Sequence, residues 1–194
     1  TPTDSRVINR MAEINEALIG NPSSVHRFGA LSERYLTESR VKIANYLHCK
    51  PDEVYATGSG TESNNLALLG VARANRGRGN HIITTAIEHP SVLNACRALE
   101  RDGFSINYLP VNKIGFVSAK DFRQAVTPKT ILASVHLANS ELGVIQPIRE
   151  LAAIAKGRGI YFHTDACQAA AFLDLNVEKL GVDLLTLNGT KLYG

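Results

Sequence analysis

Residues 131–164, which read ILASVHLANS ELGVIQPIRE LAAIAKGRGI YFHT, decide the fold of this chain. The apolar run at 131–135 predicts a strand, and the β-forming segment Tyr161–Thr164 predicts another. Between them the segment 147–157 predicts a helix, and Pro147 suits its first turn. Strands with such continuous apolar runs are typical of a parallel sheet that helices cover on both faces. The stretch therefore predicts one strand–helix–strand unit of an α/β fold.

The same alternation extends outward along the rest of the chain. Further strands are predicted at 54–57, 81–85, 105–110 and 184–187. Further helices are predicted at 5–18, 29–47, 62–75, 91–102 and 119–126. The helix at 62–75 is apolar almost all round, so we expect it to be buried. The whole pattern predicts a three-layer α/β/α fold with a mainly parallel sheet. Ligands of such sheets bind beyond the carboxyl ends of the strands.

Composition excludes several classes of function. The 194 residues hold 21 Lys and Arg against 18 Asp and Glu, and this net charge of +3 is too balanced to indicate nucleic acid or an anionic membrane. No apolar run reaches the ~18 residues of a spanning helix, and no secretory signal is visible. The three cysteines show neither disulfide nor zinc spacing, so we expect no metal and a reducing, cytoplasmic location. The start at Thr1 and the stop at Gly194 suggest a piece of a longer protein.

A glycine-rich loop, Gly58-Ser59-Gly60-Thr61-Glu62-Ser63, opens the predicted helix at 62–75. Glycines let the backbone approach an anion, and the free amides at a helix start point toward it. An ordinary helix cap at Thr61 explains the loop equally well. A dinucleotide fingerprint requires Gly where Ser63 stands, but Glu88 could act as its ribose-binding acid. A non-enzymatic nucleotide-binding module therefore remains an alternative.

Two other strand ends carry polar groups that could contact a ligand. His89 follows the strand at 81–85 and could stack on a flat ring or move a proton, although a capping histidine is the commoner case. Asn139 follows the strand at 131–135, where an amide could bind a ligand oxygen or simply close a turn.

An acid and a lysine follow the last two strands. Asp165 needs a cationic or donor partner at the edge of a buried sheet, and a protonated pyridine nitrogen would be one; an N-cap is the plainer role. Lys191 follows a core strand, where apolar surroundings would favour a nucleophilic neutral amine; a solvated surface lysine is commoner. Together, the phosphate loop, ring platform, nitrogen partner and imine-forming lysine are the set that pyridoxal phosphate requires.

At this point the sequence resembles the NifS/IscS-type cysteine desulfurases of the class V aminotransferase family, which are pyridoxal phosphate enzymes of fold type I. Six ordered motifs carry the resemblance over essentially the whole chain. They are Gly20-Asn21-Pro22-Ser23-Ser24-Val25-His26, Gly60-Thr61-Glu62-Ser63-Asn64-Asn65, Glu88-His89-Pro90-Ser91-Val92, the stretch from Asn139 to Ile148, His163-Thr164-Asp165-Ala166-Cys167-Gln168, and Lys191-Leu192-Tyr193-Gly194.

The resemblance implies a role for each matching residue. The loop with Gly60, Thr61 and Glu62 would hold the phosphate, with Thr61 as its ligand. Asn139 would lie near cofactor and substrate. The remaining roles are ring stacking by His89, pairing with the ring nitrogen by Asp165, bonding to the ring hydroxyl by Gln168, and the imine link and proton transfer by Lys191. The implied reaction takes sulfur from L-cysteine, leaving alanine and an enzyme persulfide, for iron–sulfur cluster or thiolation pathways.

The sequence also departs from the family pattern. Asn188 and Thr190 occupy the Ser and His positions of the Ser-x-His-Lys motif, and we assign them to the cofactor site with altered phosphate contacts. Ser140 replaces the second Asn of an Asn-Asn pair.

The resemblance also sets what we expect of this piece as a whole. We expect residues 1–194 to be a partial large domain that lacks the N-terminal strand, the small domain, the persulfide cysteine and the arginine that holds the substrate carboxylate. This piece alone is then expected to be inactive. The family further implies a homodimer and a sulfur-acceptor or scaffold partner. Selenocysteine lyase, aminotransferase and a purely structural homologue are the remaining alternatives.

Overall fold

A five-stranded parallel sheet forms the centre of residues Thr57–Asn188. In this computed structural model, which describes residues 2–17 and 19–194, the strand order is β2-β1-β3-β4-β5 and every neighbouring pair is parallel. The strands are β1 (His81–Thr85), β2 (Ser105–Leu109), β3 (Thr130–Ser134), β4 (Tyr161–Asp165) and β5 (Leu184–Thr186). Because all strands point the same way, their carboxyl ends share one edge of the sheet, as the alternation in the sequence predicted.

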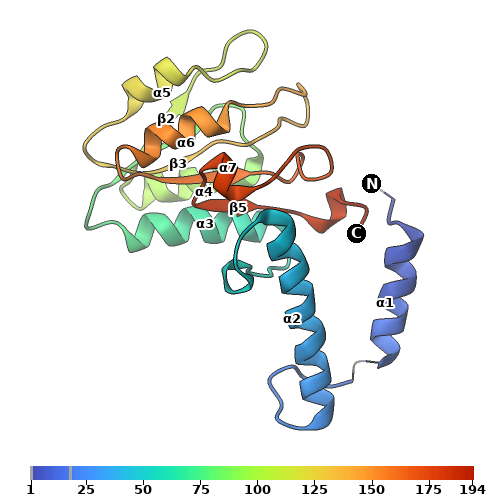
Figure 1. Cartoon of the computed structure of the whole chain (residues 1–194). Coiled ribbons are helices and arrows are strands. Elements are labelled where there is room, and N and C mark those ends of the chain that lie inside the picture. The colour runs from blue at the N-terminus through green and yellow to red at the C-terminus, as the bar shows by residue number, and fades with distance from the viewer. Residues whose placement is uncertain (1, 18) are drawn as a thin grey trace. The chain divides into compact units, whose positions relative to one another are not determined.

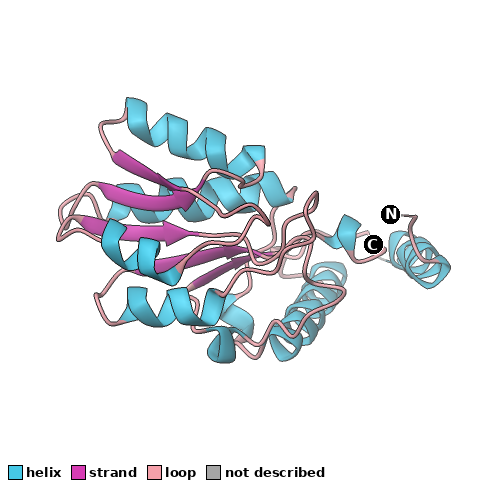
Figure 2. Cartoon of the chain, turned by 90° about the horizontal axis from the view of Figure 1, so that it is seen from above, coloured by secondary structure: helices cyan, strands magenta, loops and turns pink. Residues whose placement is uncertain are grey.

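Helices cover both faces of this sheet, as Figure 2 shows. On one face α3 packs against α4 and lies over β3, β4 and β5, while on the other face α6 contacts β4, α5 and α7 (Figure 1). The bounds are α3 (Gly60–Ala74), α4 (Pro90–Arg101), α5 (Ala119–Ala125), α6 (Ile148–Lys156) and α7 (Val177–Leu180). The three-layer α/β/α fold is confirmed.

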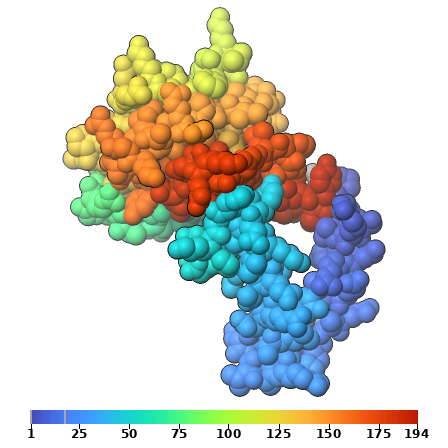
Figure 3. Space-filling model, in the orientation of Figure 1, coloured from blue at the N-terminus to red at the C-terminus, as the bar shows by residue number. Residues whose placement is uncertain are grey.

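The core lies between the sheet and these helices. β1 and β3 are buried along their whole length, and residues such as Ile82, Leu132 and Phe162 are at most 1% exposed. The connection from β2 through α5 to β3 carries more exposed side chains, among them Ile114 and Phe116, and it stands out from the surface of this unit in Figure 3. Burial of β-branched and other large apolar side chains explains why β1 and β3 form the middle of the sheet.

A second compact unit contains Thr1–Ala56 and Gly189–Gly194. Its elements are α1 (Ser5–Ala17), α2 (Arg27–Leu47) and two short 3₁₀ helices, η1 (Pro51–Glu53) and η2 (Gly189–Lys191). The turn before α2 explains the Gly20–His26 motif, because a Cβ at Gly20 would overlap the Phe28 backbone and His26 Nδ1 accepts the Gly29 amide at 3.2 Å. This motif therefore has a structural role in the entry to α2.

Three expectations about secondary structure need comment. The strand predicted at 54–57 is wrong: this run forms no ladder with a described strand, and Tyr55 is 77% exposed. A short apolar run without a hydrogen-bonded neighbour stays irregular. The predicted burial of 62–75 on all sides is also wrong, because Leu66 is 57% exposed while Leu68 is buried. The predicted helix at 5–18 is observed as α1, although Leu18 lies outside the described residues.

Candidate active site

The candidate site lies at the carboxyl edge of the sheet, on the face that α3 covers. Asp165 ends β4, and its side chain is on the same face as those of His163 on β4 and Ser134 on β3, since alternate residues of a strand share a face. The register pairs Ser134 with His163, so the next pair on this face is His136 with Asp165. A row of buried polar side chains thus runs along the sheet toward its edge.

Asp165 is fixed by two hydrogen bonds. The residue is 7% exposed. Its Oδ2 accepts from Asn64 Nδ2 at 2.7 Å, and its Oδ1 accepts from the Cys167 amide at 3.0 Å. Two neutral donors leave lone pairs of the carboxylate free for a further, cationic partner. A buried acid held in this way suits a protonated nitrogen.

His89 lies at the start of α4 and is held by its own helix. Its Nδ1 accepts the Ser91 amide at 3.1 Å, and the Ser91 hydroxyl lies 2.7 Å from the same nitrogen. Because Nδ1 accepts, the proton of the neutral ring belongs on Nε2. The His89 side chain caps α4 and is exposed, so its ring is both oriented and accessible.

The glycine-rich loop forms the first turn of α3. The Ser59 hydroxyl, and not Thr61, caps the helix by accepting the Glu62 amide at 3.1 Å, while the Glu62 carboxylate accepts the Gly58 amide at 2.6 Å. An added Cβ at Gly60 would lie 3.1 Å from Cys167 Sγ, so the helix start packs closely on the segment that follows β4. The Gly60 and Thr61 amides have no acceptor within the helix at these positions, which leaves them free for an anion.

A buried ion pair lies beside Asp165. Glu88 Oε1 is 3.0 Å from His136 Nδ1, both Glu88 oxygens accept the His136 amide, and Thr85 donates its hydroxyl to Glu88. Burial disfavours the charged imidazole, but the hydrogen bond and charge of Glu88 outweigh it and raise the pKa of His136 above its usual value. The Glu88 side chain is 0% exposed, so this residue is the partner of His136 and not the ribose-binding acid considered from the sequence.

His163 lies on the same face of the sheet, two residues before Asp165 on β4, and its pKa is shifted in the opposite direction to that of His136. Its Nδ1 and Nε2 lie 2.8 Å and 3.0 Å from the hydroxyls of Ser134 and Thr186. Burial lowers the pKa of His163 to about 4, against a smaller opposing effect of Asp165. The His163 ring is therefore neutral at physiological pH.

These two histidines predict a stability that declines on both sides of neutral pH. The His136 contribution is present below the unfolded pKa of about 6.5 and is lost as the pH rises through its raised folded pKa. The His163 contribution is present above about 6.5 and is lost as the pH falls toward about 4. Denaturant unfolding across pH, with NMR titration of both rings, measures the two effects.

The variant Glu88→Gln separates them. We expect it to remove the loss of stability on the alkaline side and to leave the His163 titration in place. A His136 pKa at or below the ordinary value in the unchanged protein would contradict the assigned ion pair.

The other predicted site residues differ in their burial and in the compact unit to which they belong. Asn139 is half-buried and has a structural role, since its Oδ1 accepts the amides of Glu141 and Leu142 and its Nδ2 donates to the Ile87 carbonyl at 3.2 Å. Gln168 is exposed and Asn188 is half-buried at the end of this unit.

Thr190 and Lys191 belong to the other compact unit, where both are exposed. The apolar surroundings expected for Lys191 are therefore not observed, because the chain turns into η2 after β5.

Three residues of this cluster were not predicted from the sequence as functional candidates: Asn64, Ser91 and His136. Asn64 follows Gly60 and precedes Leu68 at helical spacing, so it places an amide on the buried stripe of α3. His136 alternates with Ser134 in an otherwise apolar run. The sequence signal that could have found them is a polar residue at a position that helix or strand periodicity assigns to the core.

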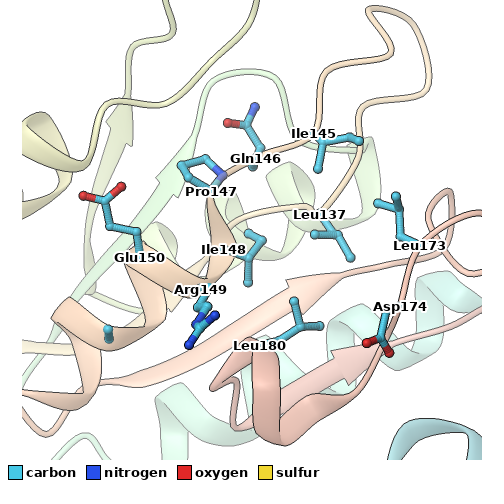
Figure 4. Close-up of a pocket in the computed structure, with 11 residues that line it drawn as sticks. Leu137, Ile145, Gln146, Pro147, Ile148, Arg149, Glu150, Leu173, Asp174 and Leu180 are labelled. Carbon is cyan, nitrogen blue, oxygen red and sulfur yellow. The ribbon is translucent and has the colours of Figure 1, made fainter.

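An apolar groove of about 660 Å³ lies on the opposite face of the sheet (Figure 4). Leu137, Ile148 and Leu180 line it, and Leu137 points away from the His136 face because neighbouring strand residues alternate. The groove includes none of the Asp165 cluster and is not the candidate site.

Within the described residues, no helix has the length and apolar character needed to cross a membrane. The same residues contain no group of His, Cys, Asp and Glu side chains that could hold a metal ion.

Known proteins resemble this chain along its whole length. The sequence profile of the Aminotransferase class-V family matches residues 1–194. The chain is 47% identical to a cysteine desulfurase IscS of Dictyoglomus turgidum over 194 residues, which is 100% of this chain and 49% of that protein. Among solved structures, SspA in complex with cysteine has a TM-score of 0.96 at 37% identity, and a NifS-like protein has 0.97 at 34%.

These matches cover the whole chain but only part of each relative. The two structural matches include 100% of this chain and 56% and 54% of the other chains. The chain spans about half the length of the curated relatives it matches. The resemblance to NifS/IscS-type enzymes seen in the sequence is confirmed, and the chain belongs to the class V aminotransferase family.

Proposed function

We propose that this chain is the cofactor-binding part of a pyridoxal phosphate-dependent cysteine desulfurase. The observation that carries the proposal is Asp165, a buried carboxylate held by Asn64 and the Cys167 amide at the carboxyl edge of the sheet. Class V aminotransferases depend in general on pyridoxal phosphate. In this proposal both compact units belong to one partial large domain.

The donor set of residues 57–188 fits the cofactor. Asp165 supplies a negative partner for a ring nitrogen, and His89 supplies an accessible aromatic ring held by Ser91. The first turn of α3 supplies amides at Gly60 and Thr61 that are not bonded within the helix. Because Gly60 has no Cβ, this turn packs closely against Cys167 and Asn188. Acid, platform and anion site are the three features that the cofactor needs from this unit.

The remaining predicted residues complete the proposed site. Gln168 would bond to the ring hydroxyl, and Asn139 would lie near the substrate. Thr61, Glu62, Asn188 and Thr190 would surround the phosphate. Lys191 would bind the cofactor through its amine and carry protons to and from the substrate carbon. When bound, pyridoxal phosphate supplies an electron sink that weakens bonds at the α and β carbons of the substrate.

The proposed substrate is L-cysteine, which the solved SspA structure contains. Its carbon–sulfur bond breaks, the sulfur forms a persulfide with a protein thiolate, and protonation of the carbon leaves alanine. Cys96 is unsuited to that thiolate, because burial raises its pKa to about 12, and burial also raises the pKa of Cys49. A homodimer, a separate sulfur acceptor and a cytoplasmic location complete the proposal.

A trapping experiment tests the proposal. The protein carrying this chain is incubated with pyridoxal phosphate and then with borohydride, and the modified peptide is identified by mass spectrometry. We expect the reduced adduct on Lys191, whose amine has added to the aldehyde with loss of water before reduction. The absence of a Lys191 adduct at saturating cofactor would overturn the proposal.

Product analysis then identifies the reaction class. Alanine and transferable sulfur from L-cysteine are expected. Alanine from selenocysteine alone, or amino transfer to a keto acid, would assign the protein to another branch of the family. The 194 residues alone are expected to form no alanine.

A further inference from the structure

Four side chains from three elements form one continuous hydrogen-bonded chain. Asn64 Nδ2 lies 2.7 Å from Asp165 Oδ2 and 2.9 Å from Ser91 Oγ, and Ser91 Oγ lies 2.7 Å from His89 Nδ1. α3 supplies the amide, α4 and its cap supply the hydroxyl and the ring, and β4 supplies the acid. The chain therefore links the acid to the ring that lies at the start of the neighbouring helix.

The hydrogen positions in this chain have one consistent arrangement. Both protons of the Asn64 amide are used, one on the carboxylate and one on the Ser91 oxygen. Ser91 then has its own proton left to donate, and His89 Nδ1 is the acceptor within reach, since it also accepts the Ser91 amide. Asn64 therefore leaves the Ser91 hydroxyl as a donor toward His89, and the Ser91 amide independently keeps Nδ1 of that ring as the acceptor.

The two central side chains of this hydrogen-bonded chain, Asn64 and Ser91, are buried. Asn64 is 1% exposed and Ser91 is 6% exposed. The Asn64 side-chain oxygen is buried and finds no hydrogen-bond partner among the described residues. An amide in this position is costly for a helix that otherwise packs small and apolar residues on the sheet. The amide is kept at the cost of a buried oxygen that makes no hydrogen bond, and what it provides in return is the pair of hydrogen bonds to Asp165 and Ser91.

We propose that Asn64 is a positioning residue that holds the Asp165 carboxylate toward the cofactor's ring nitrogen and, through Ser91, keeps the His89 ring in its stacking orientation. The inference rests on the proposed function, because it assigns Asp165 and His89 to the cofactor. Asn64 itself contacts neither the ring nor the substrate.

The first test compares two ligands in the variant Asn64→Ala. Pyridoxal phosphate and its 1-deaza analogue, in which carbon replaces the ring nitrogen, are titrated into the apo form of the protein carrying this chain. Loss of an oriented charge-assisted hydrogen bond is expected to weaken binding of pyridoxal phosphate by about tenfold or more. The analogue offers no protonated nitrogen to Asp165, so its affinity is expected to change far less.

Asn65→Ala is the matched control. Asn65 is the next residue of α3, and its side chain donates to the Thr61 carbonyl of the same helix at 2.8 Å. We expect this variant to preserve the preference for pyridoxal phosphate over the analogue. If Asn64→Ala weakens both ligands equally, Asn64 only supports the fold and the inference is overturned. If the unchanged protein binds neither ligand, the proposed function fails instead.

A second measurement needs no cofactor and tests the other end of the chain. Nitrogen-15 NMR of the apo protein reports the hydrogen bonds that reach His89 Nδ1. The Ser91 backbone amide keeps the proton on Nε2 in every variant. Ser91→Ala removes the hydroxyl donor and is expected to shift the Nδ1 resonance. Asn64→Ala is expected to shift this resonance as well, whereas Asn65→Ala is expected to leave it unchanged. An unchanged His89 signal in both Ser91→Ala and Asn64→Ala would remove the proposed link through Ser91.

Discussion

Replacement of Asp165 by alanine is expected to abolish productive cofactor binding and to destabilise the fold by about 2–4 kcal/mol. The substitution leaves one proton of the buried Asn64 amide and the half-buried Cys167 amide without an acceptor, and each orphaned donor is costly. It also removes the negative charge proposed to keep the ring nitrogen protonated. Denaturant unfolding of the apo protein and a cofactor titration measure the two effects separately.

The isosteric variant Asp165→Asn distinguishes charge from shape. It keeps the size of the side chain but cannot hold a protonated nitrogen, so turnover is expected to fall by about a hundredfold or more, as for other preorganised polar partners. Asp183→Asn is the control, because Asp183 Oδ2 accepts the Phe162 amide at 2.8 Å at the opposite end of β4. That variant is expected to keep cofactor affinity. Full turnover in Asp165→Asn would contradict the assigned role.

Much of the fold could be predicted from local sequence signals. β1 begins and ends where the strand predicted at 81–85 does, and α4 begins at Pro90, one residue before its predicted start. Both signals are local, since apolar periodicity and a proline in the first turn act within a few residues. The run at 54–57 carries the same signal but has no neighbouring strand in the described residues, and a ladder depends on chain segments that a local pattern does not contain.

The candidate site was only partly predictable for a related reason. Asp165 and His89 could be selected because each follows a predicted strand, where ligands of parallel sheets bind. Asn64 could not be selected in this way, because its partners Ser91 and Asp165 are 27 and 101 residues away in the chain. Glu88 was likewise interpreted as a possible ligand-binding acid. Its real partner, His136, could not be seen from the sequence, because the two side chains meet only when β1 and β3 are neighbours in the sheet.

Replacement of Lys191 by alanine is expected to have the largest effect on activity. The proposed reaction uses this amine both to attach the cofactor and to move protons at the substrate carbon. Proton transfer by a positioned group alone is worth about 10²–10⁴ in rate, so turnover should fall at least about 10³-fold. The fold should be unaffected, because Lys191 is exposed in the short helix η2. Turnover of L-cysteine and the borohydride adduct are the two measurements.

Two control variants show whether the chemistry of the amine, and not its charge, is responsible. Lys191→Arg retains a positive charge, but a guanidinium is not a nucleophile at neutral pH, so this variant should be as inactive as Lys191→Ala. Lys156→Ala removes an exposed lysine from the last turn of α6 and should retain both turnover and adduct. Activity in Lys191→Arg would mean that only a cation is needed at this position. The adduct would then have to lie on another lysine, and the assignment of Lys191 would be wrong.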